Sequence, residues 1–163
     1  MFKKLKTYQK IFIFSILVVA TISCFDILSL HSGIFGTPSE YLVGDFGAEG
    51  IGWWGLFYQF NLVVLVLISA SYFWFGRKDF SETISLFLSS FALWMYFGLA
   101  DLLFFIFQGK FPPSSLHWLN NGYIGKLSSI MGFPGVTATS LYLCVGIGLI
   151  FVYFGIKFLY ERF

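Results

Sequence analysis

Four long apolar runs occupy most of the chain, and short polar segments separate them. Each run exceeds the roughly 18 residues that mark a membrane-span candidate, because about 20 residues of helix cross a ~30 Å hydrocarbon core. The pattern predicts an all-α fold, a polytopic membrane protein with four transmembrane helices in an antiparallel bundle and two extracytoplasmic loops. Since little chain lies outside the runs, residues 1–163 are expected to form a single four-helix transmembrane domain. The expected spans are residues 11–31, 53–75, 83–107 and 136–160.

The composition agrees with a membrane protein and argues against a soluble one. Of the 163 residues, 58% are hydrophobic and only 11% are charged, whereas a soluble domain carries roughly 25% charged residues. The net charge of +2 does not indicate nucleic-acid binding, because the basic residues lie in short tails and loops. We therefore expect the lipid bilayer as the main partner, together with other membrane subunits or self-association, and no nucleic acid.

The distribution of basic residues predicts how the chain sits in the membrane. Eight of the ten lie before the first run, after the second or at the end of the fourth, whereas Lys110 and Lys126 lie between the third and fourth runs. Since Lys and Arg are retained on the cytoplasmic side, we expect a multi-pass protein of the cell membrane with both termini cytoplasmic. The basic start of the first run also fits a signal peptide. Its apolar character continues through Leu30, however, so we expect an uncleaved span.

Three local features refine this outline. The stretch "TPSE" in the first outer loop has the pattern of a helix start and predicts a short surface helix at about residues 38–43. The stretch "SSLHWL" at 114–119 predicts a helical turn in the second outer loop. The two cysteines, Cys24 and Cys144, lie in separate spans and no Cys-x-x-Cys motif is present. We expect both to be small buried thiols rather than part of a redox or metal site.

Hydrogen-bonding side chains concentrate near the extracytoplasmic ends of the expected spans. At about 1.5 Å of rise per residue, Asp101 lies ~27 Å and Asp26 ~23 Å above the cytoplasmic start of its span. By the same count, Gln59 and Asn61 lie ~9–12 Å below the outer end of theirs. This shared depth predicts one pocket in which Asp26, Asn61 and Asp101 face one another beneath the loop around His117. The ligand-pocket candidates are Asp26, Gln59, Asn61, Asp101, Thr139 and Trp118.

The acids inside apolar runs require an explanation, because a carboxylate at the bilayer centre costs ~2.5–3.5 kcal/mol. Each is either a functional group or part of a hydrogen-bond network at a helix end, and the sequence leaves both readings open. The candidates for acid–base catalysis are Asp101, Asp26, His117 and His31. His31, His117 and Glu49 are weak metal-ligand candidates. No HExxH motif or helical histidine pair is present, so no metal site is expected, and the identity of any cofactor stays open.

These features favour a small integral membrane protein with a polar pocket in the outer leaflet. Its expected role is non-catalytic, either as an accessory subunit of a membrane complex or as a binding protein for a lipid-like ligand. The alternative is a membrane-embedded enzyme that acts on a lipid-like or quinone-like substrate at the extracytoplasmic side, and the sequence does not decide between the two. A channel is disfavoured, because the cytoplasmic halves of the spans lack an ionisable relay.

The predicted orientation can be tested by cysteine labelling in intact cells, with the two native cysteines replaced. A cysteine at Ser39 or Ser128 should react with a membrane-impermeant reagent from the outside, because both positions fall in the outer loops. Labelling of these positions only after the cytoplasmic side is opened would reverse the orientation, and with it the depth of every polar residue.

Overall fold

The computed structural model describes residues 5–32, 48–76 and 78–162, and the side chains among them other than 29–32, 48–58 and 162. These residues form helices and turns without any strand, so the all-helical prediction is confirmed for this part of the chain. The expected surface helix at 38–43 lies outside the described residues. The elements are α1 (Thr7–Ser32), α2 (Ala48–Gly76), α3 (Phe80–Met95), α4 (Leu99–Phe107), the 3₁₀ turn η3 (His117–Leu119), α5 (Tyr123–Ile130) and α6 (Ala138–Arg162).

Several of these helices have the length and apolar composition of membrane spans. Thr7–Leu28 of α1, Gln59–Gly76 of α2 and Ala138–Glu161 of α6 each pass this test alone, and α3 with α4 passes it as one bent pair. The described residues therefore include three helices able to cross a membrane, or four if the bent pair is a single span. These helices overlap the four apolar runs of the sequence, and the bounds of the expected spans stay a prediction.

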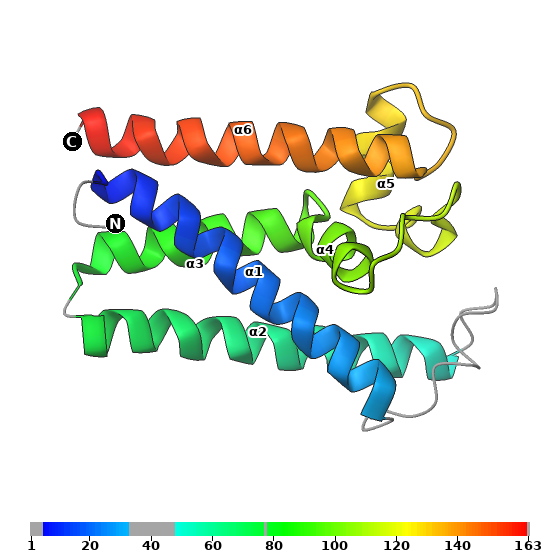
Figure 1. Cartoon of the computed structure of the whole chain (residues 1–163), viewed down its shortest axis with the longest axis horizontal. Coiled ribbons are helices and arrows are strands. Elements are labelled where there is room, and N and C mark those ends of the chain that lie inside the picture. The colour runs from blue at the N-terminus through cyan, green and yellow to red at the C-terminus, as the bar shows by residue number, and fades with distance from the viewer. Residues whose placement is uncertain (1–4, 33–47, 77, 163) are drawn as a thin grey trace.

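The helices lie side by side, with α3 between α2 and α6 and α1 lying across them (Figure 1). The start of α1, the end of α6 and the short connection from α2 to α3 share one end of the molecule, and α4 and α5 lie at the other. At the shared end, Glu161 of α6 lies 3.9 Å from the ammonium groups of both Lys6 and Lys157. This arrangement makes α1 the helix that contacts each of α2, α3, α4 and α6.

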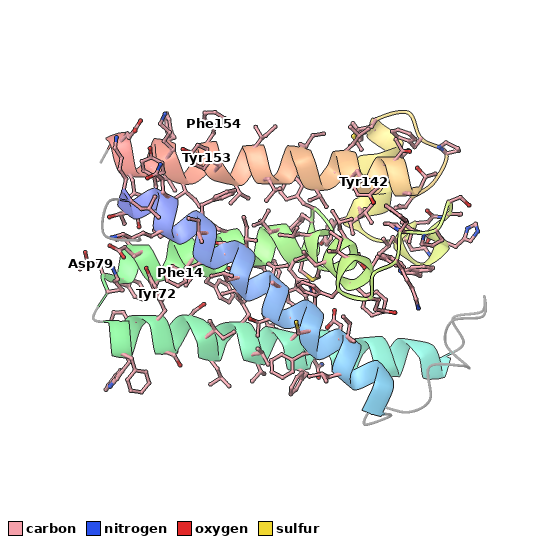
Figure 2. The ribbon with its side chains drawn as sticks, viewed as in Figure 1. Phe14, Tyr72, Asp79, Tyr142, Tyr153 and Phe154 are labelled. Atoms are coloured by element: carbon pink, nitrogen blue, oxygen red, sulfur yellow. The ribbon has the colours of Figure 1, made fainter. Side chains whose placement is uncertain are left out.

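Apolar and aromatic packing holds the end of the molecule where α1 begins. The ring of Tyr153 on α6 lies 5.2 Å from Phe12 and 5.8 Å from Tyr8, centroid to centroid. Figure 2 shows Phe14 of α1 close to Tyr72 of α2, and their ring centroids are 5.7 Å apart. Large apolar side chains also face outward from α2 and α6, as expected of helices surrounded by hydrocarbon. Among them are Val63, Val66, Leu67, Ile150, Phe154 and Phe158.

The expected single span at 83–107 is wrong in one respect, because the chain breaks into α3 and α4, which meet at an angle of 70°. Gly98 lies at the break with φ +71°, in the left-handed region that a continuing right-handed helix cannot use. A side chain there would also crowd its neighbours, since a Cβ would lie 2.8 Å from Leu141 and 2.9 Å from Ile124. The depth of Asp101 therefore does not follow from a uniform rise along residues 83–107, and the ~27 Å estimate fails beyond Met95.

The segment between α4 and α6, which the sequence predicts as the second outer loop, is more structured than the sequence indicates. The helical turn expected within 114–119 is present as η3, and it is followed by α5, which the hydrophobic pattern does not predict. Ser128 of α5 is fully buried and donates a hydrogen bond to the carbonyl of Gly135, 3.0 Å away. The exposed neighbour Ser129 is therefore the better labelling position for the orientation test.

The two cysteines differ in their surroundings. Cys144 of α6 is buried, as expected, whereas Cys24 of α1 is exposed, so the expectation of a buried thiol is wrong for Cys24. Both thiols are free. Polar residues such as Ser23 and Asp26 interrupt the apolar run on either side of Cys24, so hydropathy alone does not show which side of the helix faces outward.

Two glycines of α6 give a matched test of the packing around the break. A Cβ at Gly148 would overlap the ring of Phe97, whereas a Cβ at Gly146 would meet open space. Gly146→Ala should stabilise the protein by up to ~1 kcal/mol through helix propensity. Gly148→Ala should instead destabilise it by ~1–3 kcal/mol, because Phe97 must move. Thermal unfolding in detergent measures both, and equal effects of the two substitutions would contradict this packing.

Candidate functional site

A buried hydrogen bond joins α1 to α2 in the half of the molecule away from the chain ends. Nδ2 of Asn61 donates to Oδ1 of Asp26 at 3.2 Å. Asn61 is fully buried and Asp26 is partly buried. Buried polar groups in an apolar surrounding need such partners, because an unpaired one costs free energy comparable to a lost hydrogen bond. The structure thus brings together two of the residues expected to face one another.

Asp101 lies near this pair on a third helix, α4. Its carboxyl group is close enough to that of Asp26 for the two like charges to repel each other when both are ionised. Because the chain breaks at Gly98, Asp101 falls in the first turn of α4, where the unpaired backbone N–H groups favour a negative charge. Its carboxylate accepts a hydrogen bond from its own backbone N–H. These two features explain why an acid is tolerated in an apolar run.

Sequence analysis misses Ser23, which links α1 to α4 beside this group. Ser23 is fully buried, and its hydroxyl lies 3.1 Å from the carbonyl oxygens of both Val19 and Ala100. Ala100 directly precedes Asp101 in α4. The signal was present in the sequence, because Ser23 lies three residues before Asp26 and therefore shares its face of α1.

One atom of the group has no partner within the described part of the chain. Oδ1 of Asn61 is buried and accepts no hydrogen bond from the described residues, while Nδ2 of the same amide donates to Asp26. A side-chain amide offers two donor hydrogens and two acceptor lone pairs, and leaving a buried acceptor unsatisfied costs ~1–3 kcal/mol. A ligand hydroxyl or amine placed against Oδ1 would remove that cost. We refer below to Asp26, Asn61 and Asp101 as the carboxyl–amide cluster.

Other predicted pocket residues lie elsewhere or serve a different purpose. Gln59 and Thr139 are exposed. At the start of α6, Thr137 and Ser140 form the polar contacts instead, with reciprocal side chain to backbone hydrogen bonds of 2.9 and 3.2 Å like those of a capping box. Trp118 is partly buried and packs against the apolar core.

The histidines are not brought to the carboxyl–amide cluster by any contact that the structure gives. His117 is exposed, and its ring nitrogens lie 3.1 and 3.3 Å from the hydroxyl of Ser115. The side chains of His31 and Glu49 lie outside the described residues. Among the residues that are described, no three His, Cys, Asp or Glu side chains gather as metal ligands would. That the loop around His117 covers the cluster therefore stays a prediction.

A separate pocket of about 390 Å³ opens at the break between α3 and α4. It is bounded by α3, α5 and α6 and does not include the carboxyl–amide cluster. Nearly all of its lining is apolar or aromatic, and Lys126 is the one residue of the lining that carries a charge. Prominent among the lining residues are Tyr96, Phe97, Tyr123, Lys126, Leu127 and Phe151.

Comparison with known proteins gives no relative from which a role can be transferred. No family model, curated protein or solved structure matches the chain. The role of the carboxyl–amide cluster therefore has to be inferred from its own geometry and chemistry.

The link between α1 and α2 can be measured with a double-mutant cycle. Asn61→Leu and Asp26→Leu should each lower the free energy of unfolding by ~1–3 kcal/mol, because each removes one partner of the hydrogen bond between the two helices. The double variant should lose less than the sum, since the energy of this shared hydrogen bond is then counted once. Gln59→Leu is the matched control, because it makes the same change at an exposed position of α2. Strict additivity of the two single effects would show that the hydrogen bond does not hold the helices together.

Proposed function

We propose that this protein is a non-catalytic, multi-pass protein of the cell membrane that binds a lipid-like ligand at the carboxyl–amide cluster, either alone or as an accessory subunit of a membrane complex. One observation carries the proposal. Asn61 is fully buried among apolar helices, yet none of the described residues donates to its Oδ1, while its Nδ2 donates to Asp26. A buried acceptor of this kind suits a ligand that carries a hydroxyl or amine donor.

The proposed topology is an antiparallel bundle of four spans with both termini in the cytoplasm. It is supported by the common location of the start of α1, the end of α6 and the α2–α3 connection at one end of the molecule (Figure 1). Basic residues at that end include Lys6, Lys78 and Lys157, and retention of basic residues on the cytoplasmic side favours this orientation. In this topology the carboxyl–amide cluster lies in the outer half of the bilayer.

The surroundings of the cluster favour a ligand with an apolar body. Phe25 and Phe60 directly precede Asp26 and Asn61 in the chain, and their rings pack edge to face at 6.2 Å between centroids. They are 39% and 42% exposed, on helices whose outward surface is apolar. An amphipathic molecule can place its polar group against Asn61 and its apolar part along these rings. A small polar solute would have no comparable contact.

An enzymatic role is the second candidate, favoured by the two carboxyl groups that share this site. Asp26 and Asp101 interact electrostatically although they come from different helices. A pair of acids in one apolar site is an arrangement suited to general acid–base chemistry on a bound substrate. In that case the protein would act on a lipid-like or quinone-like substrate at the extracytoplasmic side, with Asp101 or Asp26 as the proton donor or acceptor.

The binding proposal predicts that lipid retained through purification depends on Asn61. Wild type, Asn61→Leu and the control Gln59→Leu would be purified in the same detergent, and the lipids bound to each quantified by mass spectrometry. At least one lipid species should be retained by the wild type and by Gln59→Leu and fall by about tenfold in Asn61→Leu, as expected for loss of a buried hydrogen bond of ~1.4 kcal/mol. Identical lipid profiles in the three proteins would contradict the proposal.

Substitutions of Asp101 distinguish binding from catalysis. Asp101→Asn is nearly isosteric, so it should keep the fold and, in a binding protein, the retained lipid. Asp101→Leu should lower the free energy of unfolding by ~1–3 kcal/mol, because it removes the carboxylate that accepts from the backbone N–H of Asp101 in the first turn of α4. Thermal unfolding and lipid mass spectrometry measure both effects. The other possible outcome is that the wild type chemically converts a bound lipid and Asp101→Asn keeps the same lipid unconverted. In that case the enzymatic alternative replaces the binding proposal.

A further inference from the structure

The pocket at the break between α3 and α4 is open at the surface and has a mainly apolar and aromatic lining. Its volume of about 390 Å³ falls within the ~300–1,000 Å³ typical of small-molecule sites. The side chains of Phe97 and Phe151 form part of the wall, with ring centroids 6.1 Å apart. At 82% and 68% exposure, Ile130 and Phe151 leave the rim open to the apolar surroundings of the helices rather than closed by protein.

A cation stands at the edge of this apolar pocket. The ammonium group of Lys126 lies 5.6 Å from the centre of the Tyr123 ring, and the Tyr123 ring lies 4.4 Å from that of Tyr96. The salt bridges formed within the described part of the chain involve other lysines. Lys126 and both tyrosines are exposed, so a charged group of a ligand could reach the ammonium from outside. Tyrosine, with an apolar ring and a polar tip, suits the boundary between hydrocarbon and headgroups.

We propose that this pocket binds one acyl chain of an anionic membrane lipid, whose phosphate-bearing headgroup pairs with Lys126. Charge complementarity selects the headgroup, because the pocket presents a single cation without a described acidic partner. The apolar lining selects an acyl chain, and the exposed rim gives it access from the bilayer. A soluble anion would leave the aromatic lining unfilled, and a neutral lipid would leave Lys126 without a counter-ion. This site is separate from the carboxyl–amide cluster and does not depend on the function proposed for it.

The proposal is tested with the full-length protein in detergent, delipidated and then titrated with phosphatidylglycerol or with phosphatidylcholine of the same acyl chains. Native mass spectrometry reports the lipid bound to each protein molecule. We expect the wild type to prefer phosphatidylglycerol. Lys126→Gln should weaken phosphatidylglycerol binding by about fivefold, the contribution of one lysine near an anionic headgroup. It should weaken phosphatidylcholine binding less, because the choline cation offsets the charge of the phosphate. Lys126→Arg should restore the preference.

Lys110→Gln is the matched control for charge. Lys110 is exposed in the same outer segment, its ammonium donates to Gln108 at 3.2 Å, and it does not line the pocket. Its substitution should leave both affinities unchanged. Ala92→Phe tests the acyl chain, because Ala92 lines the pocket and a larger side chain there would fill it; binding of both lipids should fall. Asn61→Leu should keep the phosphatidylglycerol preference, which separates this site from the carboxyl–amide cluster.

Three results would overturn the proposal. Equal losses in Lys126→Gln and Lys110→Gln would mean that any cation in this segment attracts the lipid. Equal binding of the two lipids by the wild type would mean that the headgroup is not recognised. Unchanged binding in an Ala92→Phe protein that keeps its thermal stability would mean that the chain lies elsewhere. Lys126 is exposed, so its variants should fold. The first two results therefore test the proposal even if the Ala92→Phe variant does not fold.

Discussion

The left-handed backbone at Gly98 determines much of what lies at the end of the molecule away from the termini. It turns the chain by 70° between α3 and α4. The turn places Asp101 in the first turn of a new helix instead of deep within a continuous one. It also leaves Tyr96 and Phe97 beside α5 and α6, where they line the pocket. A glycine is required at this position because Leu141 and Ile124 occupy the space that a Cβ would need.

Breaking a helix inside an apolar bundle exposes backbone groups that lipid cannot satisfy, so neighbouring groups must do so. The N–H groups of Tyr96 and Phe97 both turn back to the carbonyl of Ala92, at 3.0 and 3.3 Å. Beyond the break, the N–H of Leu102 donates to the carbonyl of Gly98 at 3.1 Å. The hydroxyl of Ser23 on α1 donates to the carbonyl of Ala100, also at 3.1 Å. This contact joins α1 to α4 just beyond the break.

The sequence predicts the parts of this structure that follow from unbroken helices. In α1 and α2 the rise per residue is regular, so counting along each helix correctly brings Asp26 and Asn61 to one depth and into contact. The same count includes Gln59, which is exposed on α2, because residues two apart on a helix face in different directions. Thr139 is also exposed, and Thr137 and Ser140 form the cap of α6 beside it. A role of Gln59 or Thr139 in a ligand pocket stays a prediction. Hydropathy does not reveal the break, because it counts apolar residues and carries no information on φ at Gly98.

The pocket could not be predicted from the sequence, for a different physical reason. Its walls come from α3, α5 and α6, and they meet only because the break at Gly98 turns the chain and α5 folds back. Aromatic residues are abundant throughout the chain, with 23 phenylalanines and nine tyrosines, so Tyr96 and Tyr123 do not stand out from the rest. Lys126 contributes to the sequence argument only as one of two basic residues on the outer side. Its position over the Tyr123 ring is a property of the folded chain.

The two ends of the molecule are held together by different forces, and this difference bears on function. Near the termini, helices are joined by aromatic contacts and by the carboxylate of Glu82. This carboxylate accepts a hydrogen bond from the Tyr72 hydroxyl at 3.3 Å and forms an ion pair with Lys78, also at 3.3 Å. At the other end, α1 is joined to α2 and α4 through buried polar groups. Between helices in lipid there is no hydrophobic driving force, so such hydrogen bonds contribute to association as well as forming the site. A ligand that satisfied Oδ1 of Asn61 would thus also stabilise the contact between α1 and α2, by an amount that rises with the logarithm of its concentration above its Kd.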